Sequence, residues 1–110
     1  MTSSSPQDRR FHPRHPTSRR GVVVAEGREL PCVITDTSEG GVRIRLDRAV
    51  TLPRGLALVD VDQALAADAT VAWQKGAEAG LTLGPRVSVR GLVPSRLLPA
   101  REAWVRASRR

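Results

Sequence analysis

The chain has 110 residues, enough for one domain, and a formal net charge of +7. It contains one phenylalanine, two tryptophans and one cysteine, which excludes an intrachain disulfide, a cysteine-rich metal site and an aromatic core. The basicity lies at the ends, with +4 over residues 1–20, −3 over residues 21–85 and +6 over residues 86–110. A uniformly basic face, as a dedicated duplex-DNA binder requires, is therefore not expected.

The first twenty residues carry no pattern of a regular helix. Residues 1–8 are rich in Ser, Thr and Pro and are predicted to be disordered, whereas residues 9–20 mix five arginines with prolines and histidines. Proline disfavours a helix, so residues 9–20 are predicted to form an extended arginine-rich arm, which orders only if the surface of the domain or a ligand holds it. The N-terminus lacks the apolar segment of a secretory signal, and no apolar run approaches the roughly 18 residues of a membrane helix, so we expect a soluble cytoplasmic protein.

From residue 21 the pattern changes to short apolar or alternating runs separated by turns that carry glycine or proline. The alternation of Val42, Ile44 and Leu46 with charged residues is typical of a half-buried strand. Six strands are predicted, at residues 22–25, 29–35, 42–46, 56–61, 67–73 and 79–83. Since no helix interrupts them, the fold class expected for residues 21–84 is all-β, a small six-stranded antiparallel β-barrel.

Three single residues carry structural expectations. Cys32 lies within an apolar run and is predicted to be buried and inert. Trp73 is expected in the core, on one face of the fifth strand with Ala67, Ala69 and Val71. Residues 85–110 form a basic C-terminal extension with a short helix predicted at residues 100–108, docked through Trp104.

A polar corner separates the second and third predicted strands, with a carboxylate, a hydroxyl and two glycines at Asp36, Ser38, Gly40 and Gly41. An ionised carboxylate only accepts hydrogen bonds, so Asp36 suits the N1–H and N2–H₂ edge of guanine. Ser38 either donates to a ligand or binds the corner's own backbone. Glycine allows the backbone to approach a base closely. By itself this corner would be an ordinary turn.

The arm supplies a second group of polar residues, the arginine pair Arg10 and Arg14. A guanidinium is planar and always charged, so it can donate two hydrogen bonds at once to a phosphate or to the O6/N7 edge of guanine. An arginine-rich arm alone is most often a solvated tail. The arm and the corner together predict a pocket for an anionic ligand that contains guanine.

The spacing of these residues resembles that of the PilZ domain, the bacterial receptor module for cyclic di-GMP. The resemblance rests on Arg10-xxx-Arg14, Asp36-x-Ser38-xx-Gly41, and Val71-x-Trp73 followed by Gly76-x-Glu78-x-Gly80-Leu81, and it covers residues 9–84. It implies a six-stranded β-barrel against which the arm holds the ligand. The implied ligand-binding residues are Arg9, Arg10, Arg14, Asp36, Ser38 and Gly41.

Two features bear on how closely the family pattern is followed. Arg9 resembles the arginine of members that hold two stacked ligands, which implies two cyclic di-GMP molecules per protomer. Leu83 stands where the family often has an aromatic residue, and three prolines follow Gly84, so the C-terminal helix is expected to be short and late.

The function predicted from the sequence is a single-domain cyclic di-GMP receptor whose arm orders on binding and which signals to a separate partner protein. No catalytic residues, metal ligands or cofactor are expected, because the histidines of the arm lack a third ligand nearby. One alternative is a small basic β-barrel that binds single-stranded nucleic acid, although only Trp73 among the strands offers a stacking ring. Another is a ligand-free relative that serves as a protein-docking module.

Overall fold

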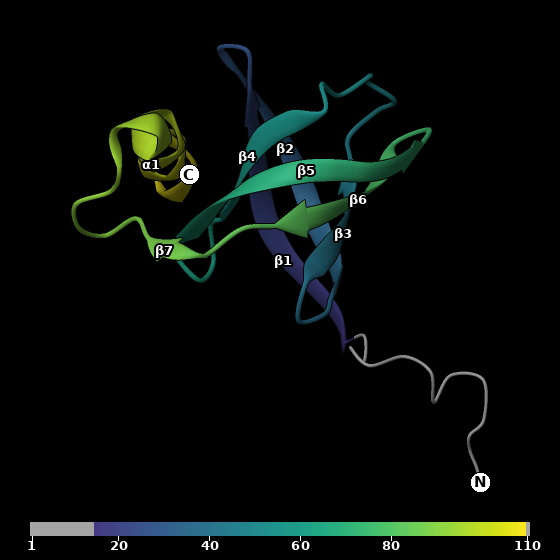
Figure 1. The fold of residues 1–110 in the computed structure, drawn as a ribbon, viewed down its shortest axis with the longest axis horizontal. Coiled ribbons are helices and arrows are strands. Elements are labelled where there is room, and N and C mark those ends of the chain that lie inside the picture. Colours follow the sequence, from purple (N-terminus) through teal and green to yellow (C-terminus); the bar gives the residue numbers. More distant parts are fainter. Residues whose placement is uncertain (1–14, 110) are drawn as a thin grey trace, which may run out of the picture.

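A computed structural model of the protein describes residues 15–109 as a closed antiparallel β-barrel with one C-terminal helix (Figure 1). The strands run in the spatial order β4-β1-β2-β3-β6-β5, and pairing between β4 and β5 closes the barrel. The six-stranded antiparallel barrel expected from the sequence is therefore confirmed. Its strands are β1 His15–Ala25, β2 Arg28–Thr37, β3 Gly41–Leu46, β4 Gly55–Asp60, β5 Leu65–Lys75 and β6 Glu78–Leu83.

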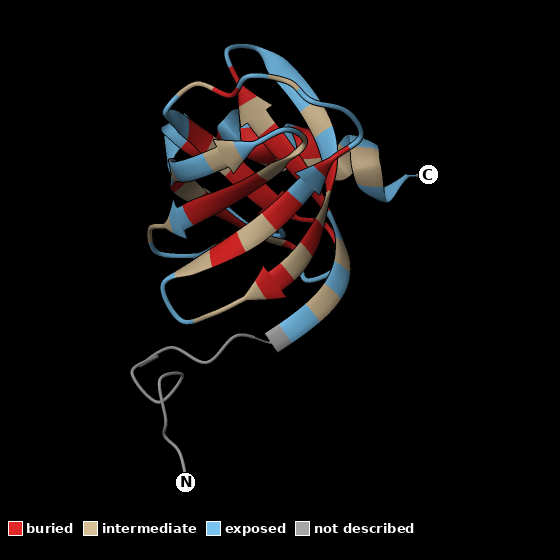
Figure 2. Cartoon of the chain, turned by 90° about the vertical axis from the view of Figure 1, so that its right-hand side faces the viewer, coloured by how far each residue is buried: buried red, intermediate tan, exposed pale blue. Residues whose placement is uncertain are grey.

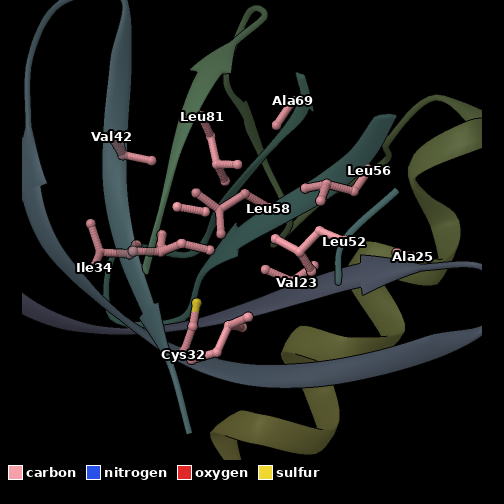
Figure 3. Close-up of a cluster of buried hydrophobic side chains, with 13 residues drawn as sticks. Val23, Ala25, Cys32, Ile34, Val42, Leu52, Leu56, Leu58, Ala69 and Leu81 are labelled. Atoms are coloured by element: carbon pink, nitrogen blue, oxygen red, sulfur yellow. The ribbon is translucent and has the colours of Figure 1, made fainter. Parts of the chain in front are cut away.

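Buried and exposed residues alternate along the barrel strands, as Figure 2 shows. The interior is filled by Val, Leu, Ile and Ala side chains together with Cys32, many of which are drawn in Figure 3. Ile34 and Ile44 are the largest of its almost completely buried side chains. Burial raises the pKa of the Cys32 thiol to about 12, so Cys32 is an inert core residue, as predicted.

The first strand begins at His15, whereas the sequence pattern placed its start at residue 22. Residues His15 to Arg20 pair with β2, while β4 pairs with β1 only from Gly21 to Val24. Within the described residues, the beginning of β1 is thus a sheet edge, and the ladder there is interrupted by a bulge between Pro16 and Arg19. An edge next to a bulge tolerates a proline, which is why a segment rich in Pro and Arg continues the strand.

A second apolar cluster joins the outside of the barrel to helix α1, Leu98–Ser108. The helix follows a short strand β7, Val87–Ser88, which pairs with β5, and a 3₁₀ turn η2 over Ser95–Leu97. Trp104 donates its indole N–H to the backbone oxygen of Val61 at 3.2 Å, so its predicted role as the docking residue is confirmed. None of the helices in the described part is long and apolar enough to span a membrane.

The helix covers only one side of the barrel. Its buried residues Ala100 and Ala103, together with Leu97 of η2, pack against Val22 of β1 and Val59 of β4. The outer faces of β3 and β6 lie away from the helix, on the other side of the ribbon in Figure 1.

Candidate ligand-binding site

The position of Asp36 is set by a bulge in β2. Ile34 pairs with Ile44, but the next pair is Asp36 with Arg43, so Thr35 is an extra residue on β2. Ile44 faces the core and Arg43 faces out, and directly paired residues share a face. Asp36 therefore lies on the outer face of the barrel, where its Oδ2 accepts from Arg43 Nη2 at 3.0 Å. The residue is only 8% exposed there.

A second bulge, in β5, has the same effect on Trp73. Val71 pairs with Leu81 and Trp73 with Gly80, so Ala72 is the extra residue. The prediction that Trp73 belongs to the core is therefore wrong, because the bulge turns it to the outer face, where it is 43% exposed. Its indole occupies the space that a side chain at Gly80 would need. Bulges of this kind re-aim side chains and are common beside functional sites.

These residues form a row across four strands, which we call the outer row: Asp36 on β2, Arg43 on β3, Gly80 on β6 and Trp73 on β5. Arg43 pairs with Gly80, so the residues follow one another in register. Three strand spacings of about 4.8 Å make the row about 14 Å long. It presents an acceptor, a fixed cation and an aromatic ring in sequence, which suits a planar heterocycle with a polar edge and an anionic group.

The corner at the end of β2 is held by its own backbone. The Ser38 N–H donates to the Gly41 oxygen at 2.9 Å, and the Ser38 hydroxyl lies 3.3 Å from the same oxygen. A Cβ atom at Gly41 would lie 2.5 Å from the backbone oxygen of Leu81, so only glycine allows β3 to approach β6 this closely. Ser38 and Gly41 thus have structural roles in the barrel, whatever else they contact.

The sequence-predicted site divides into two parts. The structure brings Asp36, Ser38 and Gly41 together at one end of β2 and β3. Arg9, Arg10 and Arg14 lie outside the described residues. The described chain begins beside the corner, since His15 pairs with Thr37 and Pro16 with Asp36.

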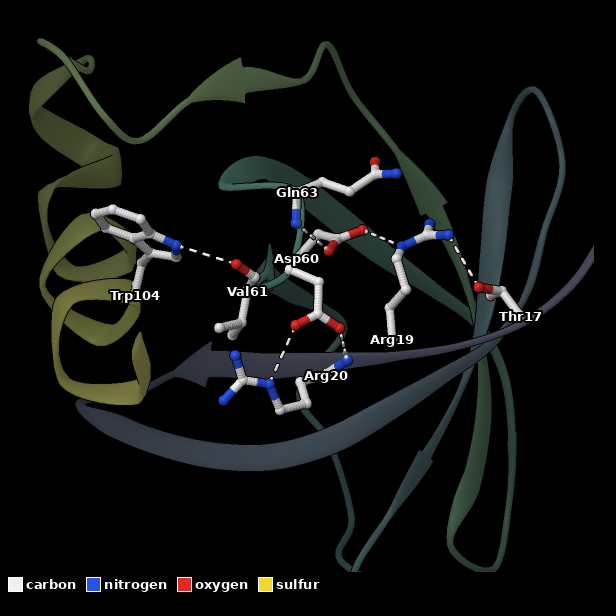
Figure 4. Close-up of polar contacts among 8 residues, drawn as sticks. Thr17, Arg19, Arg20, Asp60, Val61, Gln63 and Trp104 are labelled. Atoms are coloured by element: carbon white, nitrogen blue, oxygen red, sulfur yellow. Dashed lines mark hydrogen bonds and ion pairs between the residues drawn. The ribbon is translucent and has the colours of Figure 1, made fainter. Parts of the chain in front are cut away.

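A pocket of about 480 Å³ opens at the mouth of the barrel beside this corner, with Thr37, Ser38 and Glu39 along one side. The pocket is also lined by an ion pair in which Arg19 Nε donates to Asp60 Oδ2 at 2.7 Å (Figure 4). The pocket and the outer row therefore both adjoin this corner.

Arg19 and Arg20 of β1 are held by acids at the end of β4 and in the connection that follows it. Beside the Arg19–Asp60 pair, the Arg20 backbone N–H donates to Asp62 Oδ2 at 2.9 Å and Arg20 Nε to Asp62 Oδ1 at 3.1 Å. The backbone hydrogen bond from Arg20, followed by its guanidinium, lowers the pKa of Asp62. Arg19 and Arg20, the last two residues of the predicted arm, therefore fasten β1 to the barrel.

The sequence analysis missed Arg43 as a site residue and assigned Trp73 to the core. In the sequence, Arg43 is one of several charged residues on the outer face of its strand. The bulge that aligns it with Asp36 cannot be recognised from the alternation of apolar and polar residues. Among the described residues, no three His, Cys, Asp or Glu side chains are grouped as a metal site.

No curated protein sequence matches the chain. A sequence model of the family described as PilZ domain matches residues 8–95. The matched range contains all six barrel strands, the polar corner and every residue of the outer row. Since the match spans most of the chain and the barrel is present, the chain belongs to the PilZ domain family.

Proposed function

We propose that the protein is a receptor for cyclic di-GMP, and that the outer row with the adjacent corner is where the nucleotide binds. The observation that supports this best is the pair of bulges, which turns Asp36 and Trp73 to one face of a PilZ barrel and in register. Binding of cyclic di-GMP is the activity that family membership implies. We propose no catalytic activity, since the family consists of binding modules.

The chemistry of the outer row fits the guanines of the ligand. The Asp36 carboxylate accepts hydrogen bonds from the N1–H and N2–H₂ edge, a pattern that adenine does not offer. The Trp73 ring, at the other end of the row, offers a stacking surface for the second guanine of the ligand. Arg10 and Arg14 supply bidentate contacts to the phosphates and to the O6/N7 edge. With Arg9 as a further planar cation, two stacked ligand molecules bind each protomer.

We propose that ligand binding changes the surface that the protein offers to other proteins. Ligand binding holds the part of the predicted arm that precedes β1, residues 9–14, against the corner, because β1 begins directly beside Asp36 and Thr37. A surface that exists only in the bound state is then offered to a separate partner protein. As the receptor of an intracellular second messenger, the protein acts in the cytoplasm.

Isothermal titration calorimetry tests this function. The purified protein is titrated with cyclic di-GMP, cyclic di-AMP and a single-stranded oligonucleotide at matched salt. We expect saturable binding of cyclic di-GMP at two molecules per chain, and much weaker binding of cyclic di-AMP. Binding of the oligonucleotide alone, with an affinity that falls steeply as salt rises, would instead make the basic ends of the chain the functional element.

A further inference from the structure

Arg43 belongs to neither of the two predicted groups of ligand-binding residues, the arginine arm and the polar corner. It lies at the centre of the outer row, paired in register with Asp36 on one side and with Gly80 on the other. Its Nη2 atom donates to Asp36 Oδ2 at 3.0 Å, while 40% of its side chain stays exposed. Arg43 is thus an anchored cation with further N–H groups available at the surface.

The pairing matters because of where Asp36 lies. The Asp36 side chain is 12% exposed, and an ionised carboxylate that is largely removed from water needs a partner of opposite charge. The ligand also carries two phosphates, which an uncompensated carboxylate repels. The guanidinium of Arg43 reduces this repulsion and, as a planar fork, restricts the orientation of the carboxylate.

The bulge at Thr35 is what makes the contact possible. In a regular ladder the residue opposite Arg43 would be Thr35, because Ile34 already pairs with Ile44. The extra residue brings Asp36 into that position, and the hydroxyl of Thr35 lies 3.3 Å from the Arg43 backbone oxygen. The acid and its cation are therefore set against each other by the register of two adjacent strands.

From this geometry we infer that Arg43 is a positioning residue, which fixes the Asp36 carboxylate for the guanine edge and so determines selectivity for guanine over adenine. The inference rests on the proposed function. Because Arg43 acts through Asp36, its removal has little effect where Asp36 has already lost its charge.

A thermodynamic cycle tests the inference by calorimetry with cyclic di-GMP and cyclic di-AMP. The variants are Arg43→Ala, Asp36→Asn and the double variant, with Arg45→Ala as the matched control. Arg45 lies two residues further along β3 on the same exposed face, in register with Glu78 rather than Asp36. Circular dichroism and thermal melting establish that each variant is folded.

We expect Arg43→Ala to weaken cyclic di-GMP binding about tenfold, the scale of one charge-assisted hydrogen bond, and to lower the ratio of the two affinities. Arg45→Ala should change neither quantity, and adding Arg43→Ala to Asp36→Asn should cost less than about threefold. Arg43→Lys, which keeps the charge without the fork, should restore part of the affinity but not the selectivity.

Two results would overturn the inference while leaving the proposed function intact. Additive effects of Arg43→Ala and Asp36→Asn would mean that Arg43 acts independently of the acid. Equal losses in Arg43→Ala and Arg45→Ala would mean a general effect of positive charge. If the unaltered protein fails to bind cyclic di-GMP, the proposed function itself is wrong, and the inference is overturned with it.

Discussion

The indole of Trp73 fills the space into which a side chain at Gly80 would project, so the ring packs directly over the glycine of the neighbouring strand. The atoms in the way belong to the rigid ring system, and even a methyl group at position 80 must displace it. The one glycine of the outer row therefore determines where the one aromatic ring of that row lies.

Gly80→Ala should consequently move Trp73 and weaken cyclic di-GMP binding about tenfold, since stacking a base on an aromatic ring is worth about 1–3 kcal/mol. Tryptophan fluorescence in a Trp104→Phe background, which leaves Trp73 as the only indole, reports the displacement. Gly55→Ala is the control, because no atom lies within 4 Å of a Cβ at that glycine. Unchanged emission and affinity in Gly80→Ala would show that the ring is not part of the binding face.

Replacing either of the two adjacent corner glycines, Gly40 and Gly41, with alanine should have different effects on stability. A Cβ at Gly41 meets the Leu81 backbone oxygen at 2.5 Å, whereas a Cβ at Gly40 meets nothing within 4 Å. We expect Gly41→Ala to lower the free energy of unfolding by about 1–3 kcal/mol through strain between β3 and β6, and Gly40→Ala to change it by much less. Urea denaturation measures both. Similar values for the two variants would contradict the structural role given to Gly41.

Arg14→Ala should abolish cyclic di-GMP binding and leave the thermal melting curve unchanged. Arg14 is proposed to bind the ligand directly, while the two apolar clusters that stabilise the fold are made of residues further along the chain. Arg48→Ala, at an exposed position after β3, is the control for loss of one positive charge. A variant that unfolds, or one that binds as the unaltered protein does, would remove Arg14 from this role.

Asp36→Ala should weaken cyclic di-GMP binding and also reduce the preference for guanine over adenine, because the acceptor for the N1–H and N2–H₂ edge is lost. Competition between cyclic di-GMP and cyclic di-AMP measures the change in selectivity. A uniform loss of affinity for both nucleotides would assign Asp36 a purely structural role.

Cys32 should resist thiol reagents until the barrel unfolds. The thiolate is the reactive form, and burial raises the pKa of this thiol to about 12, so almost all of the group is protonated at pH 8. At pH 8 we expect Ellman's reagent to react slowly with the native protein and at once in denaturant. Fast reaction of the native protein would show that the β1–β2 region opens readily.

The barrel was predictable because alternation and turn residues report which side of a strand is buried. Val42, Ile44 and Leu46 have no extra residue between them, and their pattern gave the correct face of β3. The docking of Trp104 was also readable, since an isolated aromatic residue in a short helix must find apolar partners.

The outer row was not predictable in the same way. Trp73 follows Val71 by two residues, so strict alternation assigns both to the core, and only the unpaired Ala72 reverses this. Likewise Arg43 faces Asp36 only because of the bulge at Thr35. That bulge arises from the pairing of β2 with β3, so neither strand alone indicates it. The start of β1 was missed because a segment rich in proline and arginine normally indicates irregular structure. Such a segment can continue a strand at a sheet edge, but the sequence does not show where the edge lies.

The two bulges also bear on how such a binding face changes in evolution. Loss of Thr35 would leave Asp36 directly after Ile34 and still opposite Arg43, and loss of Ala72 would leave Trp73 directly after Val71 and still opposite Gly80. Because the neighbour of an inward residue points outward in a regular strand, a descendant that had lost either codon would keep the outer row, on a strand with less bend and twist. A shift of register has the opposite effect: with Thr35 retained but paired with Arg43, Asp36 would point inward although the sequence of the corner was unchanged.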